Sequence, residues 1–163
     1  MQIHGRIYQF SKEIKLLVFV FICTLSIGFY GGITFVKKTT TANPKGIEER
    51  YLGNENDENA TKMMFKKSEG EVLTMLHNHI LSLSVIFFLL GGILATTSIN
   101  KKTQIFLMIE PFFSIIFTFG GIYFLWTGIL WMKYVIIFSG LLMTLTFTAS
   151  TIIILKELLK KVE

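Results

Sequence analysis

The chain has 163 residues, of which 52% are hydrophobic and 17% are charged, and its formal net charge is +5. A soluble domain carries about 25% charged residues, so the composition argues against a soluble globular protein. The Lys and Arg residues flank long apolar segments, which is typical of membrane anchoring, and this placement argues against nucleic-acid binding.

Four long apolar segments dominate the sequence, and they cover about residues 16–36, 72–96, 105–126 and 134–155. Each has roughly the 20 residues that an α-helix needs to cross a hydrocarbon core of about 30 Å at about 1.5 Å per residue. The sequence therefore predicts an all-α integral membrane protein, a four-transmembrane-helix bundle that forms a single membrane domain over residues 1–163.

The first apolar segment is predicted to be a retained signal-anchor helix. It is too long for the core of a typical signal peptide, and no Ala-x-Ala cleavage pattern follows it. Residues 1–15 have apolar side chains at roughly helical spacing, so they form either a short amphipathic helix or, as we favour, the end of the first span. The single cysteine, Cys23, lies in this span and is expected to be an inert small hydrophobe.

Small residues recur within the predicted spans. Gly28 and Gly32 form a Gly-x-x-x-Gly pattern in the first span, and glycine pairs occur in the second span at Gly91 and in the third at Gly120. Such residues let helix backbones approach closely, which favours ordinary packing within the bundle. A dimer face built on the Gly-x-x-x-Gly pattern is the alternative.

The connection over residues 37–71 is predicted to be a long polar loop on the outer side of the membrane. Its Asn43-Pro44 pair is typical of a turn. The stretch Asn54–Asn59 is acidic and rich in asparagine, and because its spacing does not match an EF-hand, a solvated loop is favoured over a calcium site.

The second span begins with a helix-capping signal. Ser68, followed three residues later by Glu71, forms a capping box directly before the apolar run. The box predicts that a helix begins near Glu69 and continues unbroken through His77 and His79. Successive helix residues lie about 100° apart, so the two histidines point to faces about 200° apart and cannot both bind one metal ion.

The histidine pair is the first candidate site, because ionisable side chains at membrane depth are costly. A single histidine suits an axial ligand of haem b, and His79 is favoured over His77 because it lies deeper. The second ligand would be Met132, one of the loop methionines Met63 and Met64, or a histidine of another chain. Imidazole with methionine sulfur also suits copper. The alternative is that no cofactor binds and that water or loop carboxylates satisfy both histidines.

Glu110, which directly precedes Pro111, is the second candidate site because it is the one carboxyl deep within a predicted span. Proline frees a backbone carbonyl one turn earlier, so a kinked third helix with this carboxyl is able to line a polar pocket. The functional interpretations are a proton relay or a quinone-binding carboxyl. The alternative is a carboxyl that is protonated, or hydrogen-bonded to a neighbouring side chain such as Ser98 or Thr151.

The distribution of charge predicts the orientation. Residues 1–15, the connection containing Lys101 and Lys102, and the tail after residue 155, which should continue the fourth helix, all carry excess positive charge. The positive-inside rule places them in the cytoplasm, so both ends of the chain are predicted to be inside. A one-sided belt of aromatic residues is expected at the opposite interface: Tyr30, Tyr123, Trp126, Trp131 and Tyr134.

Around the histidines, at His77-Asn78-His79-Ile80-Leu81-Ser82-Leu83, the sequence resembles small bacterial four-helix membrane proteins that carry His-x-His at the outer end of the second helix. That group includes proteins with helices like those of haem-copper oxidases. The resemblance covers the second span and the general span pattern, and it implies a link to respiratory or redox membranes.

We therefore expect a subunit of a respiratory or redox complex in a bacterial inner membrane, with haem b or a metal near the outer leaflet for electron transfer. A subunit without catalytic activity of its own is favoured. Its expected partners are the lipid bilayer and either other membrane subunits or further copies of the chain. The alternative is a structural or assembly subunit that docks through its small-residue faces and outer loop. A transporter is disfavoured, because the sequence has no paired broken helices.

Overall fold

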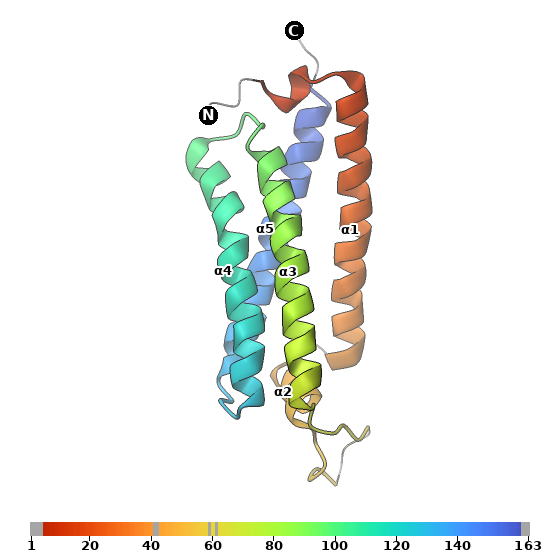
Figure 1. Ribbon diagram of the computed structural model, residues 1–163, viewed down its shortest axis with the longest axis vertical. Coiled ribbons are helices and arrows are strands. Elements are labelled where there is room, and N and C mark those ends of the chain that lie inside the picture. The colour runs from red at the N-terminus through yellow and green to blue at the C-terminus, as the bar shows by residue number, and fades with distance from the viewer. Residues whose placement is uncertain (1–4, 41–42, 59, 61, 161–163) are drawn as a thin grey trace.

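The computed structural model describes residues 5–40, 43–58, 60 and 62–160. The described chain contains a short 3-10 helix and five α-helices (Figure 1): η1 (Ile7–Gln9), α1 (Lys12–Thr40), α2 (Pro44–Leu52), α3 (Glu69–Leu94), α4 (Lys101–Trp126) and α5 (Met132–Leu158). Of these, α1, α3, α4 and α5 are long and apolar enough to cross a membrane, and no strand occurs in the described residues. The predicted all-α bundle of four spanning helices is confirmed.

The four spanning helices run alternately up and down, so the start of α1 and the end of α5 lie at the same end of the bundle (Figure 1). We call this the basic end, and it is formed by residues 5–15, 95–104 and 155–160. The opposite end, formed by residues 43–68 and 127–131, is called the loop end. An even number of spans requires this arrangement, whichever end faces the cytoplasm.

The predicted capping box determines where α3 begins. The Glu71 carboxylate accepts a hydrogen bond from the backbone N–H of Ser68 at 2.9 Å, and the Ser68 hydroxyl accepts one from the backbone N–H of Glu71 at 3.3 Å. The two bonds satisfy backbone donors that the first turn of a helix leaves unpaired. The helix begins at Glu69, as predicted, and continues unbroken through both histidines.

The packing of α4 against α5 forms the core of the bundle. A Cβ atom at Gly121 would lie 3.0 Å from Cγ1 of Ile136, which is closer than ordinary van der Waals contact, so glycine favours this approach of the two helices. Close by, the hydroxyls of Thr118 and Ser139 form a hydrogen bond of 2.7 Å between the two helices. A close approach of small residues and hydrogen bonds between helices are the contacts that hold helices together within lipid.

Helix α3 packs on a second face of α4, and α1 meets α3 where the Phe29 and Phe87 rings lie edge to face, 6.3 Å apart between centroids. Gly91 of α3 lies against Met108 of α4, so the packing role predicted for the glycine pairs is confirmed here. In an apolar 18-residue window of α4, 50% of the residues are buried, against 6% in the apolar window of α1. Gly28 and Gly32 are exposed and would have nothing within 4 Å of an added Cβ, so the prediction that they pack within the bundle is wrong.

Ring contacts and a pair of hydroxyls join α1 to the rest of the bundle. Phe29 stacks on Phe147 of α5, with 3.9 Å between ring centroids, and the Tyr30 hydroxyl lies 2.8 Å from the Thr148 hydroxyl. Thr148 is about 24 Å along the axis of α5 from Met132, where that helix begins at the loop end. Tyr30 therefore lies far from the loop end, on the exposed surface of the bundle, and its predicted place in the aromatic belt at the outer interface is wrong.

The connection between α1 and α3 is more structured than the predicted long polar loop, because it contains α2. The Asn43-Pro44 pair begins this helix instead of forming a turn: the Asn43 side chain accepts a hydrogen bond of 2.7 Å from the backbone N–H of Gly46, and proline is favoured at the first helical position. The helix buries Ile47 and Tyr51. Burial raises the pKa of the Tyr51 phenol, which remains a neutral hydrogen-bond donor.

Polar contacts fasten this connection to the ends of α4 and α5. The Lys133 ammonium, at the start of α5, lies 2.6 Å from the Glu48 carboxylate of α2. The Trp126 indole, at the end of α4, donates a hydrogen bond of 2.8 Å to the carbonyl of Lys67. The connection therefore lies over the loop end of the bundle, and Trp126 lies at an interface as predicted.

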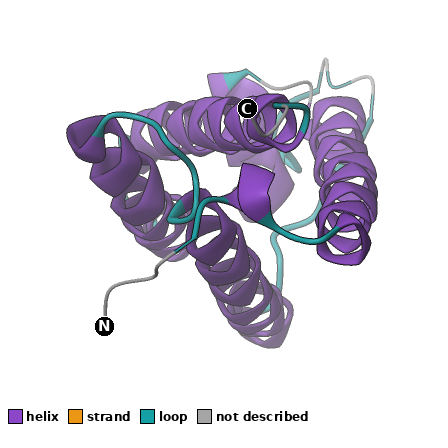
Figure 2. Ribbon diagram, turned by 90° about the horizontal axis from the view of Figure 1, so that it is seen from above, coloured by secondary structure: helices purple, strands orange, loops and turns teal. Residues whose placement is uncertain are grey.

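The N-terminal segment crosses the basic end of the bundle (Figure 2). Ile7 is fully buried, and its backbone N–H donates a hydrogen bond of 3.0 Å to the carbonyl of Thr96, just after α3. Because α1 begins only at Lys12, the continuous amphipathic helix considered for residues 1–15 does not form, and residues 1–4 lie outside the described part. The predicted continuation of the fourth helix is confirmed as far as Leu158, whereas residues 161–163 are not described.

The orientation is tested by cysteine labelling in whole bacterial cells. With the loop end outside, Asn56→Cys should react with a membrane-impermeant maleimide, whereas Lys102→Cys should react only after the cells are opened. Both positions are exposed, and the unmodified chain, whose only cysteine lies within α1, is the control. Labelling of Lys102→Cys but not of Asn56→Cys in intact cells would reverse the orientation.

Candidate functional site

The imidazole of His79 lies on the side of α3 that faces α4. Its ring is 5.1 Å from the Phe119 ring between centroids, at an interplanar angle of 31°. Its Nδ1 atom lies 2.9 Å from the backbone carbonyl of Met75, one turn earlier. A carbonyl only accepts hydrogen bonds, so this contact places the proton on Nδ1 and leaves the lone pair of Nε2 available to a ligand.

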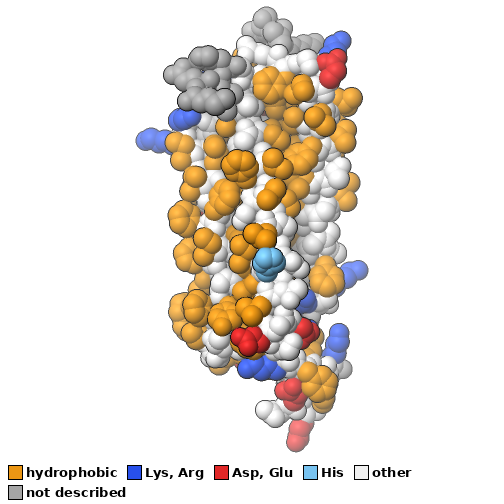
Figure 3. All heavy atoms as spheres, in the orientation of Figure 1, with side chains coloured by type: hydrophobic (Ala, Val, Ile, Leu, Met, Phe, Trp, Pro, Cys, Tyr) orange, Lys and Arg blue, Asp and Glu red, His pale blue; other side chains and the backbone are white. Residues whose placement is uncertain are grey.

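His79 lies at a depth where a polar atom needs a partner. It is about 15 Å along the helix axis from Glu69, where α3 begins, and therefore within the hydrocarbon half of the bilayer at the loop end. The side chain is exposed at the surface of the bundle, and hydrophobic side chains cover much of the bundle surface in Figure 3. Lipid offers Nε2 no hydrogen bond, so leaving it unpaired is costly.

The other residues of the predicted histidine site lie elsewhere. His77 is exposed two residues earlier, on a different face of α3. The Met132 carbonyl lies 4.0 Å from the position of a Cβ at Gly121, and Gly121 is about 200° around α4 from Phe119. The structure therefore places Met132 on another face of α4 from His79.

The loop methionines also lie away from His79. Met64 belongs to the connection before α3, where its backbone N–H donates a hydrogen bond of 2.6 Å to the Asn54 side chain. Met63, beside it, is exposed. In the described ranges, no three His, Cys, Asp or Glu side chains are grouped so that they could hold a metal ion. Among the described residues, the structure therefore does not bring Met63, Met64 or Met132 together with His79.

Glu110 is buried between α4 and its neighbours, as predicted, with 7% of its surface exposed. Its Oε1 atom accepts a hydrogen bond from the Ser114 hydroxyl, one turn further along α4. Its Oε2 atom is buried and has no hydrogen-bond partner among the described residues. A buried carboxyl oxygen without a partner is rare, and it marks the place in the bundle where a further donor would be favourable.

The partners predicted for Glu110 were wrong. Ser114 provides the hydroxyl, because residues four apart lie on the same face of a helix, and this spacing is readable from the sequence. Ser98 instead donates its backbone N–H and hydroxyl to the Glu157 carboxylate at the basic end. The Lys160 ammonium lies 2.7 Å from the other oxygen of Glu157. Thr151 bonds to a carbonyl of its own helix.

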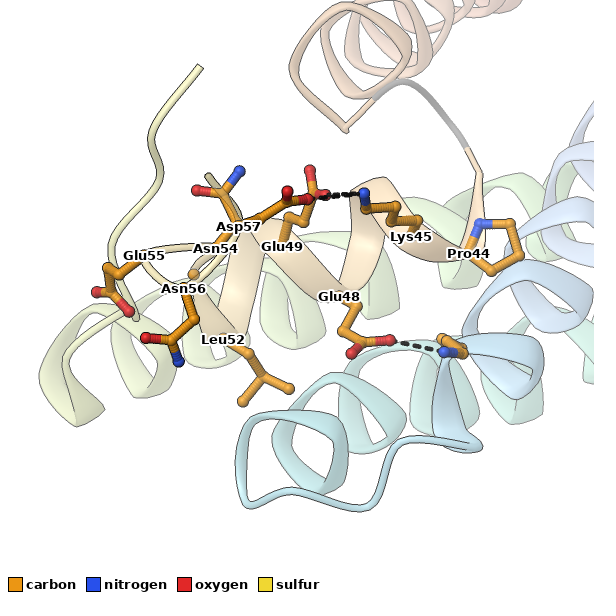
Figure 4. A pocket seen from close by; sticks show the side chains of 11 residues that line it. Pro44, Lys45, Glu48, Glu49, Leu52, Asn54, Glu55, Asn56 and Asp57 are labelled. Carbon is orange, nitrogen blue, oxygen red and sulfur yellow. Dashed lines mark hydrogen bonds and ion pairs between the residues drawn. The ribbon is translucent and has the colours of Figure 1, made fainter. Parts of the chain in front are cut away.

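A polar pocket of about 620 Å³ lies at the loop end, between α2, the residues that follow it and the start of α5 (Figure 4). Its charges are largely paired with one another. The Lys45 ammonium lies 3.0 Å from the Asp57 carboxylate and 3.5 Å from that of Glu49, and Lys133 pairs with Glu48. The hydrogen bond to Asp57 raises the pKa of Lys45. The pairs hold the connection together and leave little free charge for a ligand.

The helices and their composition define an integral membrane protein, whose spans contact the lipid bilayer. The family model named Aq_1264_TM, described as a transmembrane helical domain, matches residues 41–163. The match covers more than half of the chain, which therefore belongs to this family. No match was found among curated proteins or among solved structures. The matched residues include α2, α3, α4 and α5, and α1 precedes them.

Two substitutions at Glu110 test its interior position. Glu110→Gln keeps the size and the hydrogen-bonding capacity of the side chain, and it should change stability in detergent by less than about 1 kcal/mol. Glu110→Lys should lose about 3 kcal/mol or more, the cost of a lysine at the centre of a spanning helix. Ser114→Ala, which removes the hydroxyl donor, is the control for the hydrogen bond. Equal thermal stability of the Gln and Lys variants would show that Glu110 reaches water or lipid headgroups.

Proposed function

We propose that this protein is a subunit of a respiratory or redox complex in a bacterial inner membrane, without catalytic activity of its own. In this proposal His79 provides an axial ligand to haem b, with copper as the less favoured alternative, for electron transfer in the leaflet at the loop end. The observation that carries it is the contact between Nδ1 of His79 and the Met75 carbonyl. A histidine that ligates a metal commonly donates its other ring N–H in this way.

The surroundings of His79 favour it over His77 as the ligand. Phe119 lies beside the imidazole and is itself buried, so the ring is supported on one side by a fixed apolar surface. An apolar surface of this kind excludes water and suits the flat, apolar face of a haem. The group itself would supply one-electron chemistry, and the chain's part is to hold the imidazole in one tautomer and one orientation.

The second ligand in this proposal comes from another chain. His79 is exposed at the bundle surface, and Met132 approaches α4 from a different face. The cofactor would therefore lie between this chain and a second membrane subunit or a second copy. This requirement links the proposed ligand to the proposed membership of a complex.

The second candidate is a structural or assembly subunit that holds no cofactor. It is favoured by the outward face of α1, where Gly28 and Gly32 are open to close approach by a helix of a partner. Few residues in the apolar window of α1 are buried inside the bundle, which supports a helix that mainly contacts lipid or other subunits. The two candidates differ in whether a chromophore or a metal accompanies the purified protein.

A reduced-minus-oxidised optical spectrum of the purified protein separates the candidates. A Soret difference band is expected, and His79→Ala should abolish it because the ligating nitrogen is lost. His77→Ala should weaken the band at most, and it serves as the matched control because it also removes an exposed histidine of α3. A purified protein with neither haem nor stoichiometric copper by elemental analysis would refute the cofactor and leave the assembly subunit.

A further inference from the structure

A second polar pocket, of about 470 Å³, opens at the basic end, on the opposite side of the bilayer from His79. It lies between the N-terminal segment, the connection from α3 to α4, and the start of α4. Its polar lining residues include Arg6, Gln9, Thr96, Ser98, Lys101 and Gln104. None of the residues that line it is acidic, so the pocket differs in charge from the one at the loop end.

Two cations from separate segments meet at this pocket. Arg6 and Lys101 are both exposed, and neither forms an ion pair within the described chain. Lys101 has only a long contact with its neighbour, 3.4 Å from Nζ to the Gln104 side-chain oxygen. The pocket therefore presents two cations that are available to an anion.

The walls of the pocket are held in place independently of any ligand. The backbone bond from Ile7 to Thr96 ties the N-terminal segment to the end of α3. The Gln104 amide is buried and donates a hydrogen bond of 2.9 Å to the Leu94 carbonyl. Glu157 is bonded to the lining residue Ser98, but its charge is already paired with that of Lys160.

We propose that this pocket binds the phosphate group of an anionic phospholipid, held between Arg6 and Lys101. Phosphate matches the site chemically, because guanidinium and ammonium groups form their strongest hydrogen bonds with anionic oxygens. The start of α4 at Lys101 adds the positive end of a helix dipole. Basic pockets at the ends of spanning helices are known to accept anionic headgroups.

The surroundings favour a lipid over a soluble anion. Ile105 and Phe106, one turn beyond Lys101 on α4, are exposed on the bundle surface and would contact the acyl chains of a lipid whose phosphate fills the pocket. The described part of the basic end also contains seven Lys or Arg residues against two Glu, which attracts anionic lipid generally. Within this positively charged end of the bundle, the pocket would be a specific binding site for one lipid headgroup.

The test is binding of phosphatidylglycerol to the purified full chain in detergent, measured by native mass spectrometry and by thermal stability. Wild-type protein should bind and be stabilised by phosphatidylglycerol, and much less by zwitterionic phosphatidylcholine. The double variant Arg6→Gln, Lys101→Gln should bind phosphatidylglycerol about tenfold more weakly, because it loses two charge-assisted hydrogen bonds.

A matched double variant separates the pocket from the general charge of the basic end. Lys12→Gln with Lys156→Gln removes the same charge from exposed positions outside the pocket and should leave the affinity within about twofold of wild type. Equal losses in the two double variants would overturn the proposal in favour of unspecific attraction. So would equal stabilisation of wild type by the two lipids, a comparison that needs no variant to fold.

A third arm tests the source of the phosphate. Millimolar inorganic phosphate should stabilise the wild-type protein much less than phosphatidylglycerol, because it lacks the acyl chains that contact α4. Full stabilisation by inorganic phosphate alone, with no further effect of lipid, would assign the pocket to a soluble anion and overturn the lipid proposal. None of these outcomes depends on a cofactor at His79. The experiments therefore can refute the lipid site without refuting the proposed function, and the reverse also holds.

Discussion

The antiparallel contact between α4 and α5 is the interaction on which the rest of the bundle depends. Apolar side chains gain little by leaving lipid for one another, so helices in a bilayer need close backbone approach and hydrogen bonds. Gly121 of α4 has no side chain, so Ile136 of α5 packs closely against the α4 backbone. The hydroxyls of Thr118 and Ser139 form a hydrogen bond between the same two helices. The ends of α4 and α5 then support the loop-end connection through Trp126 of α4 and Lys133 of α5. Helix α3 joins the pair at a separate face of α4.

The family match and the packing divide the chain at the same place. The matched residues, 41–163, contain the helices that pack closely, whereas α1 precedes them and buries little of its apolar window. Its contacts with α5 are aromatic stacking at Phe29 and one hydroxyl pair at Tyr30. With only 6% of an apolar 18-residue window buried, α1 has most of its surface left for lipid or for other membrane proteins. This arrangement supports, for the proposed function, a role within an assembly.

Polar groups within the bundle differ in how fully they are satisfied. At the basic end Glu157 is bonded to Ser98 and paired with Lys160, so that cluster is a closed structural unit. By contrast, one nitrogen of His79 and one oxygen of Glu110 have no partner among the described residues. Unpaired polar atoms are costly in lipid, so these two positions are where a ligand or a partner would be most favourable. They lie at different depths and do not form one site.

Hydropathy alone determined the number and positions of the spans, because a helix of sufficient apolar length has no better environment than the bilayer. The local cap at Ser68 likewise determined where α3 begins. Only the tertiary structure decided that Gly28 faces outward, that Tyr30 pairs with Thr148 of α5 and that His79 lies beside Phe119. The physical reason is that a membrane helix is apolar on every face, so its sequence shows that it spans but not which face meets a neighbour.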